Sequence, residues 1–262
     1  MSAPTRTETV PVQSAPADGK HARRSNIIIE ERVCIPAWVD DLESFRRWAR
    51  SGEFPDRGWY SYLNGEIWVD LSMEQFFSHN RVKTRYTIVV GNLVDSGDLG
   101  YLVADRMLLT HAGANLSTEP DVLFATWEAL RCGRLRLVKG AVEGYVELEG
   151  TPDMVLEVLS TSSVHKDTEL LRELYWRAGI PEYWLVDARG EVPRFDILRY
   201  TAQGYVATEA QDGWLLSTVF GHAFRLTQLA DALGHPQYRL EVRPGQVAVQ
   251  GVESGQERVQ GT

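Results

Sequence analysis

The chain has 262 residues, a formal net charge of −9 at pH 7 and only two cysteines. This charge argues against a protein that coats nucleic acid nonspecifically, because neutralising many phosphates requires clustered Lys and Arg. Two cysteines are too few for a disulfide framework, and the sequence has neither an apolar run that could span a bilayer nor a signal-peptide-like start. We therefore expect a soluble, cytoplasmic protein with a sizeable core.

Composition divides the chain into three parts. Residues 1–25 are rich in Ala, Pro, Thr and Ser and lack apolar periodicity, which predicts a disordered N-terminal tail. Residues 243–262 are similar and predict a flexible C-terminal tail. Residues 26–242 are expected to form one domain.

The first half of that domain shows both helical and strand periodicity. Residues 40–53 have an acidic start, apolar residues at helical spacing and a glycine stop, which predicts a short helix. Asn64 and Gly65 join two strand-like runs and predict a hairpin. We then expect a longer helix in 73–97, strands in 100–113 and 119–126, and a hairpin in 134–148.

The second half contains a strand, a helix and a strand in succession. Residues 151–167 read TPDMVLEVLSTSSVHKD and begin with a strand, a helix is expected in 162–179, and 181–190 form a buried strand. This order predicts a right-handed crossover between parallel strands. Residues 194–208 suggest an outer hairpin. The fold class is therefore α/β (α+β), a mixed sheet flanked by helices with added hairpins.

Glu157 lies at the centre of the apolar strand in 154–159. A buried carboxylate is tolerated when it pairs with an Arg or Lys, or when a second carboxylate helps it hold a hard cation. Asp153 shares its strand face but lies roughly 13 Å away along the strand, too far to share one ion. Asp121, in EPDVLFA, begins another apolar strand and would meet Glu157 if the two strands are neighbours.

Asp167 falls on the apolar stripe of the following helix, one turn after its start. A carboxylate there can cap the helix or complement its dipole, or it can belong to a site at the strand end. Lys166 and His165 lie beside it and supply positive charge.

Four motifs together resemble the Uma-type family of putative restriction endonucleases, within the PD-(D/E)xK nuclease superfamily. The motifs are YSYLNGEI at 60–67, PDV at 120–122, EVLSTSS at 157–163 and YWRAGIPEYWLVD at 175–187. The resemblance implies a restriction-endonuclease-like mixed central sheet and a divalent-metal site for Mg²⁺ or Mn²⁺. Asp121 and Glu157 match the family's metal ligands, and Glu66 matches a glutamate that could act as an accessory acid. His79 falls where a helix histidine is common.

The sequence departs from the family at the catalytic lysine. The superfamily places it where this chain has Leu159, and the family places it where this chain has Leu171. Lys166 is the nearest replacement, and Arg172 is a second substitute that can stabilise charge but stays protonated.

The resemblance implies a Mg/Mn-dependent endodeoxyribonuclease with DNA as substrate, and a homodimer is typical of such enzymes. The alternative is a catalytically impaired module with this fold that binds nucleic acid or a protein partner. A β-rich structural scaffold would explain the apolar strands but not the two carboxylates that they carry.

Overall fold

The computed structural model describes residues 27–29, 33–141 and 144–245, and the chain divides into two compact units, Met1–Asp40 and Asp41–Thr262. In the first unit, β1 (Ile27–Ile29) and β2 (Val33–Ile35) pair antiparallel. The sequence predicted one domain starting at residue 26, whereas the division falls at Asp40. Of the two expected tails, 1–25 and 246–262 lie outside the described residues, and the last strand extends to Pro244.

The second unit is built on a six-stranded mixed sheet with the order β14-β13-β12-β11-β8-β5. Its central strands β11 and β12 are parallel, and every other pair is antiparallel. The strands are β5 (Gly100–Ala104), β8 (Val122–Thr126), β11 (Met154–Val158), β12 (Glu182–Asp187), β13 (Arg194–Thr201) and β14 (Gly204–Ala207). The predicted parallel crossover from β11 to β12 is therefore confirmed.

A second six-stranded sheet has the order β4-β3-β7-β6-β10-β9, with only β6 and β10 parallel. Its strands are β3 (Trp59–Leu63), β4 (Glu66–Asp70), β6 (Leu108–His111), β7 (Leu116–Thr118), β9 (Leu135–Lys139) and β10 (Tyr145–Gly150). Asn64 and Gly65, with φ of 51° and 100°, make the turn between β3 and β4. Positive φ at both positions is what a two-residue hairpin turn requires, so the Asn-Gly prediction is confirmed.

Three antiparallel strands form a smaller sheet, β15 (Leu215–Ser217), β16 (His222–Ala230) and β17 (Pro236–Pro244). The helices are α1 (Leu42–Ala49), α2 (Val82–Gly97), α3 (Trp127–Arg131) and α4 (Leu171–Arg177), with a 3₁₀ turn η2 (Ala112–Ala114). Two π-helical turns, η1 (Phe76–Arg81) and η3 (Lys166–Leu170), lead directly into α2 and α4. No helix in the part of the chain that the structure describes is long and apolar enough to cross a membrane.

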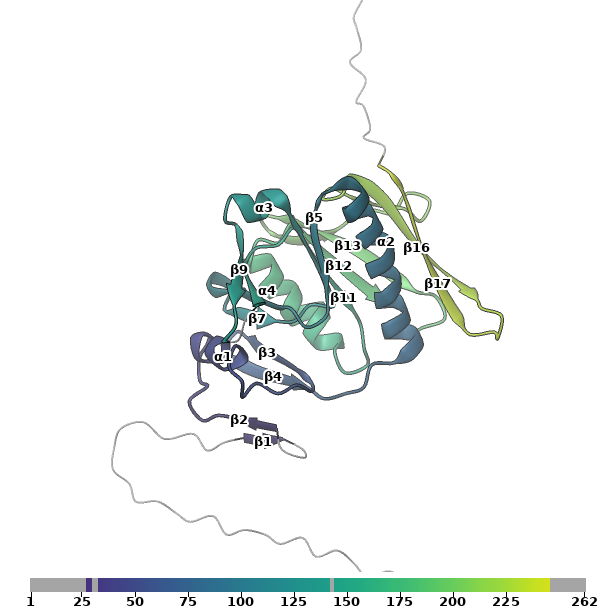
Figure 1. Ribbon diagram of the computed structural model, residues 1–262. Helices are drawn as coiled ribbons and strands as arrows, with labels where there is room; N and C mark the ends of the chain where they lie inside the picture. Colours follow the sequence, from purple (N-terminus) through teal and green to yellow (C-terminus); the bar gives the residue numbers. More distant parts are fainter. Residues whose placement is uncertain (1–26, 30–32, 142–143, 246–262) are drawn as a thin grey trace, which may run out of the picture. The chain divides into compact units, whose positions relative to one another are not determined.

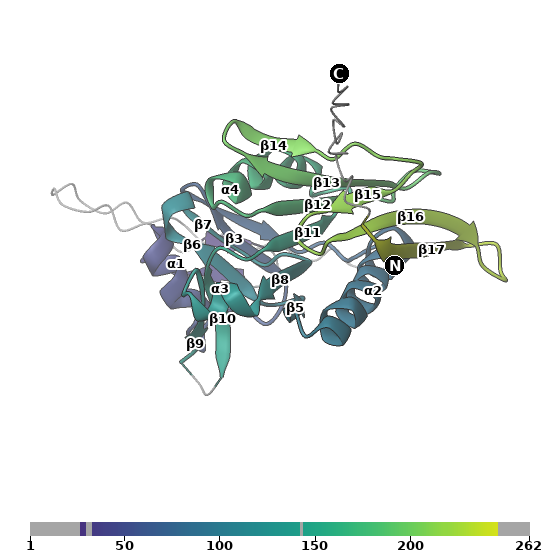
Figure 2. The same ribbon diagram turned by 90° about the horizontal axis from the view of Figure 1, so that it is seen from above.

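Two hydrophobic cores lie on the two faces of the central sheet. In the ribbon views, α2 and the β16–β17 hairpin lie on one side of β11 and β12, and α4 lies on the other (Figure 1, Figure 2). Met154, Leu156 and Val158 of β11 pack with residues of α2 and of the β15–β17 sheet. Val155, on the opposite side of the strand, packs with α4 and with the second sheet. This alternation places Glu157 on the α4 side, so a carboxylate enters an apolar interior where β11 ends.

Candidate metal and catalytic site

Asp121 and Glu157 lie side by side because β8 and β11 are neighbours in the central sheet. Leu156 is paired with Val122 in this antiparallel register, so the next pair along the ladder is Glu157 and Asp121. The N–H of Asp121 donates to Oε2 of Glu157 at 3.4 Å, and the N–H of Val158 donates to Oδ2 of Asp121 at 2.8 Å. The sequence predicted that the two carboxylates meet if their strands are neighbours, and the strands are neighbours.

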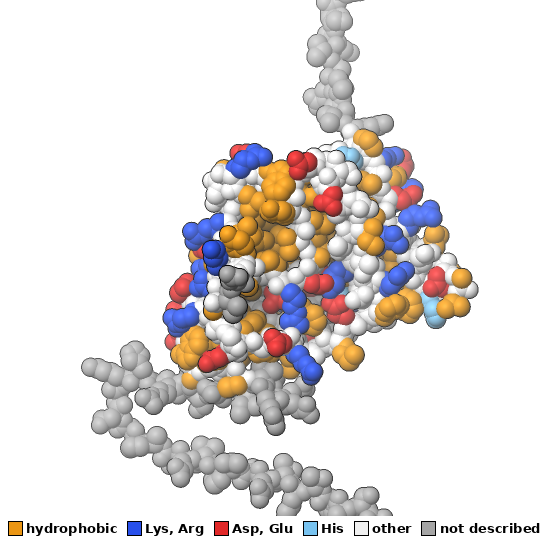
Figure 3. Space-filling view, in the orientation of Figure 1, with side chains coloured by type: hydrophobic (Ala, Val, Ile, Leu, Met, Phe, Trp, Pro, Cys, Tyr) orange, Lys and Arg blue, Asp and Glu red, His pale blue; other side chains and the backbone are white. Residues whose placement is uncertain are grey.

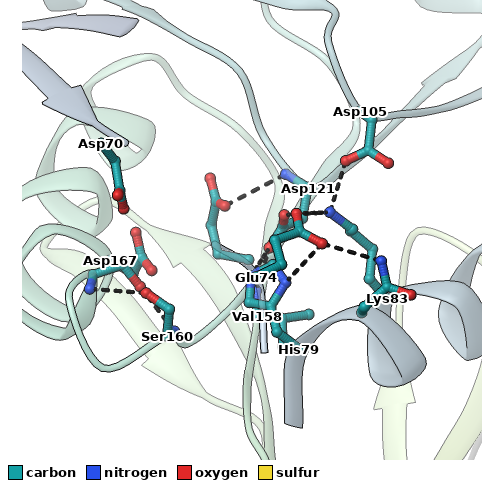
Figure 4. A network of polar contacts seen from close by, with 12 residues as sticks. Asp70, Glu74, His79, Lys83, Asp105, Asp121, Val158, Ser160 and Asp167 are labelled. Carbon is teal, nitrogen blue, oxygen red and sulfur yellow. Dashed lines mark hydrogen bonds and ion pairs between the residues drawn. The ribbon is translucent and has the colours of Figure 1, made fainter. Parts of the chain in front are cut away.

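Two cationic side chains from the start of the α2 helix hold the Asp121 carboxylate (Figure 4). Nε2 of His79 lies 3.4 Å from Oδ2 of Asp121, and Nζ of Lys83 lies 3.5 Å from Oδ1. Burial favours the neutral form of Asp121, but His79, Lys83 and the Val158 N–H prevail and lower its pKa. Asp121 is therefore an ionised carboxylate with a fixed orientation.

Glu74 and Asp105 complete this side of the network. Lys83 donates to Asp105 at 2.7 Å and forms an ion pair with Glu74. Burial works against the charged forms of both Lys83 and His79. Even so, Asp121, Asp105 and Glu74 raise the pKa of Lys83. Asp121 and Glu74 likewise raise the pKa of His79 to about 10. His79 in turn lowers the pKa of Glu74 to about 2.

The pKa of Glu157 is shifted in the opposite direction to that of Asp121. It is 4 % exposed, and the hydroxyl of Tyr175, on α4, donates to its Oε1 at 2.7 Å. Burial, followed by the negative charges of Asp167 and Asp121, raises the pKa of Glu157 to about 8. In the absence of a cation, the neutral form of Glu157 is therefore favoured at neutral pH.

Asp167 and Lys166 face the same pocket from η3. Asp167 is 2 % exposed, and burial raises its pKa to about 6 despite Nζ of Lys166 at 3.5 Å. Burial opposes the charged form of Lys166, but Asp167, Glu157 and Asp121 raise its pKa. Lys166 is therefore a charged ammonium group beside the paired carboxylates.

The pocket itself is strongly acidic. Six carboxylates line it: Asp70, Glu74, Glu119, Asp121, Glu157 and Asp167. His79 and Lys166 also line it, whereas Lys83 lies behind Asp121 and Glu74. In Figure 4, Asp70 and Asp167 lie on one side of Asp121, and Lys83 and Asp105 lie on the other.

The donor set fits a hard divalent cation. Mg²⁺ and Mn²⁺ prefer carboxylate and carbonyl oxygens, and the pocket offers the carboxylates of Asp121 and Glu157 at the end of β11. Oε2 of Glu119 is buried without a hydrogen-bond partner, and Oδ1 of Asp167 is buried and lies 3.5 Å from Nζ of Lys166. Glu74, His79 and Asp121 also bring donor atoms within 4.8 Å of one another, but the pKa of His79 is raised to about 10, so its ring would have to lose a proton before it could bind a cation.

The remaining residues singled out by the sequence fall into two groups. His79, Lys166 and Asp167 reach the pocket with Asp121 and Glu157. Glu66, the first residue of β4, is exposed and does not line the pocket. Arg172 donates to the carbonyl of Tyr205 at 3.0 Å and lines a different cavity, together with Leu159. The structure therefore does not bring Glu66 or Arg172 to the site.

Asp153, which strand spacing excluded from sharing a cation with Glu157, makes contacts that stabilise the fold. Its Oδ2 accepts a hydrogen bond from the N–H of Thr126 at 2.7 Å, and its Oδ1 pairs with Arg134. These contacts join the start of β11 to the end of β8 and to β9.

Sequence reasoning missed Glu74, Lys83, Glu119 and Tyr175. Tyr175 lies eight residues after Asp167, which is the same helix face, so helical spacing could have identified it. Glu119 lies two residues before Asp121 and shares its side of an extended chain. Lys83 lies four residues after His79, on the same helix face, so the same spacing could have identified it. Glu74 carries no such signal, because only the folded structure brings it to His79 and Lys83.

Comparison with known proteins places the chain in a family. Residues 42–229 match the family described as "Uma2: Putative restriction endonuclease". A structure from Anabaena variabilis, described as a putative nuclease belonging to DUF820, is 18% identical with a TM-score of 0.47, over 62% of this chain and 82% of that chain. No curated protein matches the sequence. Because the family match spans most of the chain and includes both strand carboxylates, the chain belongs to the Uma2 family of putative restriction endonucleases.

Proposed function

We propose that the protein is a divalent-metal-dependent endonuclease that hydrolyses DNA phosphodiester bonds at the pocket formed by Asp121 and Glu157. The observation that carries this proposal is the meeting of the two carboxylates at adjacent positions of β8 and β11, with an ammonium group in the same pocket. Membership of a family of restriction-endonuclease type supports the same reaction class.

Asp121 and Glu157 would hold the cation, with the carbonyl oxygen of Val158, which also lines the pocket. Bound Mg²⁺ or Mn²⁺ would polarise the scissile phosphate and lower the pKa of an attacking water. His79 and Lys83 keep Asp121 ionised and oriented, and Tyr175 orients Glu157. These contacts pre-organise the ligand oxygens.

Lys166 takes the part of the lysine that the family places at Leu171. Leu171 is fully buried in the core on the α4 side, whereas Lys166 lines the pocket. Because its pKa is raised, Lys166 donates hydrogen bonds and positive charge to the phosphate in the transition state rather than accepting a proton. Asp167, 3.5 Å away, holds the ammonium group in place.

Nicking of supercoiled plasmid by the purified protein in Mn²⁺ or Mg²⁺ tests the proposal. We expect nicking by the native chain and none by Asp121→Ala. Asp153→Asn is the matched control, because it alters a buried carboxylate directly before β11 that makes only structural contacts. Equal nicking by the native chain and by Asp121→Ala would assign the activity to a contaminant.

The alternative is a binding module with this fold but without catalysis. The loss of lysine at both family positions is the observation that favours it. The two functions separate if binding and cleavage are both measured on the plasmid and on a single-stranded oligonucleotide: binding without cleavage of either DNA at any metal concentration supports the module.

A further inference from the structure

A second groove adjoins the acidic pocket at the end of β11. Its volume is about 630 Å³, and Ser72, Met73 and Ser160 line both the groove and the pocket. A polymer held in the groove therefore continues directly into the pocket where Asp121 and Glu157 lie.

The groove differs sharply from the pocket in charge. No carboxylate is among the described residues that line it, although the chain as a whole carries a net charge of −9. Its one cationic side chain, Arg189, already makes two hydrogen bonds to Asp187, at 2.9 and 2.8 Å. Five serine and threonine side chains line it instead: Ser72, Ser78, Ser160, Thr161 and Ser162. An anionic group in this groove would therefore meet hydroxyl donors, with the Asp70 carboxylate 3.2 Å from Oγ of Ser162 at the edge of the groove.

Three of these hydroxyls are held in place by one another. Oγ of Ser162 lies 3.1 Å from Oγ of Ser160 and 3.3 Å from Oγ of Ser72. Ser162 also donates to Asp70 at 3.2 Å. Ser160 and Ser162 belong to the STSS segment that follows β11, three and five residues after Glu157. Each hydroxyl has both donor and acceptor capacity, so the row can bind phosphate oxygens close to the metal ligands.

The rest of the groove is aromatic and apolar. Phe77 and Tyr238 line it, and Phe77 packs against Phe76 and His235 with ring centroids 4.9 and 5.0 Å apart. Phe76 is 58 % exposed and Met73 is 95 % exposed. In the space-filling view, hydrophobic side chains gather beside a histidine over the turn between β16 and β17 (Figure 3). An aromatic surface next to phosphate-binding hydroxyls is what an unstacked nucleotide requires.

We propose that this groove binds an unpaired nucleotide of the substrate next to the scissile phosphate, so that the preferred substrate is single-stranded DNA. This inference rests on the proposed function, because it assigns the groove to the strand being cut. A base within a duplex is stacked on its neighbours and cannot lie on Phe77, whereas an unpaired base can. Aromatic stacking is insensitive to sequence, so the groove would select strand structure rather than a particular base.

Oligonucleotide binding in EDTA tests the inference without requiring cleavage. Fluorescence anisotropy compares one labelled strand in three forms: single-stranded, annealed to its complement, and single-stranded with abasic sites. We expect the single strand to bind at least about fivefold more tightly than the duplex, and the abasic strand to lose at least about fivefold in affinity. These arms use the native protein and do not depend on the folding of a variant.

Variants then locate the binding to the groove. Phe77→Leu keeps apolar volume but removes the aromatic face, and the double change Ser160→Ala with Ser162→Ala removes two hydroxyls. Both should weaken single-strand binding about fivefold or more. Tyr145→Ala is the matched control, because Tyr145 is a 51 % exposed aromatic on β10 and should leave affinity unchanged. Thermal unfolding confirms that each variant is folded.

Two results would overturn the inference: equal or tighter binding of the duplex, or equal binding of intact and abasic strands. Nicking in Mn²⁺ together with either result would contradict the groove assignment and leave the endonuclease proposal standing. Selective single-strand binding without any cleavage in Mn²⁺ would contradict the endonuclease proposal and leave the groove assignment standing.

Discussion

Asp121 and Glu157 are linked through each other's strands: the main-chain N–H of Asp121 donates to the Glu157 carboxyl, and the N–H that follows Glu157 donates to the Asp121 carboxylate. These reciprocal contacts fix the separation of the two side chains through the sheet itself. Their protonation is opposed, because the pKa of Asp121 is lowered while that of Glu157 is raised to about 8. As the proposed ligands, Asp121 is already ionised, whereas Glu157 would have to exchange its proton for the cation.

Glu157→Gln should abolish stoichiometric binding of Mn²⁺. It removes an anionic ligand, so the affinity should fall by more than the roughly 10- to 100-fold that loss of an outer-shell partner costs. Isothermal titration calorimetry measures both stoichiometry and affinity. Asp153→Asn, directly before β11, should bind one ion as the native chain does, and an undiminished site in Glu157→Gln would exclude Glu157 as a ligand.

Lys166→Met should lower kcat by about 10²–10³-fold, because it removes a charged donor aimed at the developing negative charge. Binding of Mn²⁺ should be retained, since Lys166 is not a ligand. Single-turnover cleavage of a labelled oligonucleotide gives the rate. Arg172→Met serves as the control, because Arg172 lines a different cavity and its loss should leave the rate unchanged. A reduced rate in Arg172→Met with an unchanged rate in Lys166→Met would show that Arg172, and not Lys166, replaces the family's lysine.

Tyr175→Phe should destabilise the fold by about 1–3 kcal/mol, because it removes the hydroxyl that donates to a buried carboxyl group. Urea denaturation gives the free energy of unfolding. The contribution of the contact itself comes from a double-mutant cycle with Glu157→Leu, which has no oxygen to accept the hydrogen bond. A coupling energy of zero would show that the hydrogen bond does not contribute to stability.

Binding of Mn²⁺ should strengthen as pH rises from 6 to 8. Burial and the neighbouring carboxylates raise the pKa of Glu157 to about 8, so below that pH the ion must displace a proton. Each pH unit below 8 should therefore weaken apparent affinity by up to about tenfold. Calorimetry in buffers with different ionisation enthalpies counts the released proton, and an affinity that does not change over this range would contradict the assigned protonation.

Much of the architecture follows from local sequence patterns. Asn64-Gly65 predicted the β3–β4 hairpin, and the strand, helix and strand order around Glu157 predicted the parallel pair β11 and β12. These features succeed because turn conformation and strand alternation depend on residues close together in the chain. The family motif likewise singled out Asp121 and Glu157.

The surroundings of those carboxylates depend on contacts between distant segments. Lys83 reaches Asp121 across 38 positions of sequence, and no spacing rule relates them. Glu66 shows the converse: it lies in a family motif, but the hairpin places it at an exposed position away from the pocket.

The sequence by itself determined the β3–β4 hairpin, the strand, helix and strand order around Glu157, and the two acidic residues that begin or interrupt apolar strands. Only the tertiary structure decided that β8 lies beside β11, that Lys83 and His79 neutralise one carboxylate, and that Tyr175 supports the other. The physical reason is that charge state and ligand geometry are set by burial and by neighbours a few ångströms away, which arise when the sheet pairs and the helices pack on it.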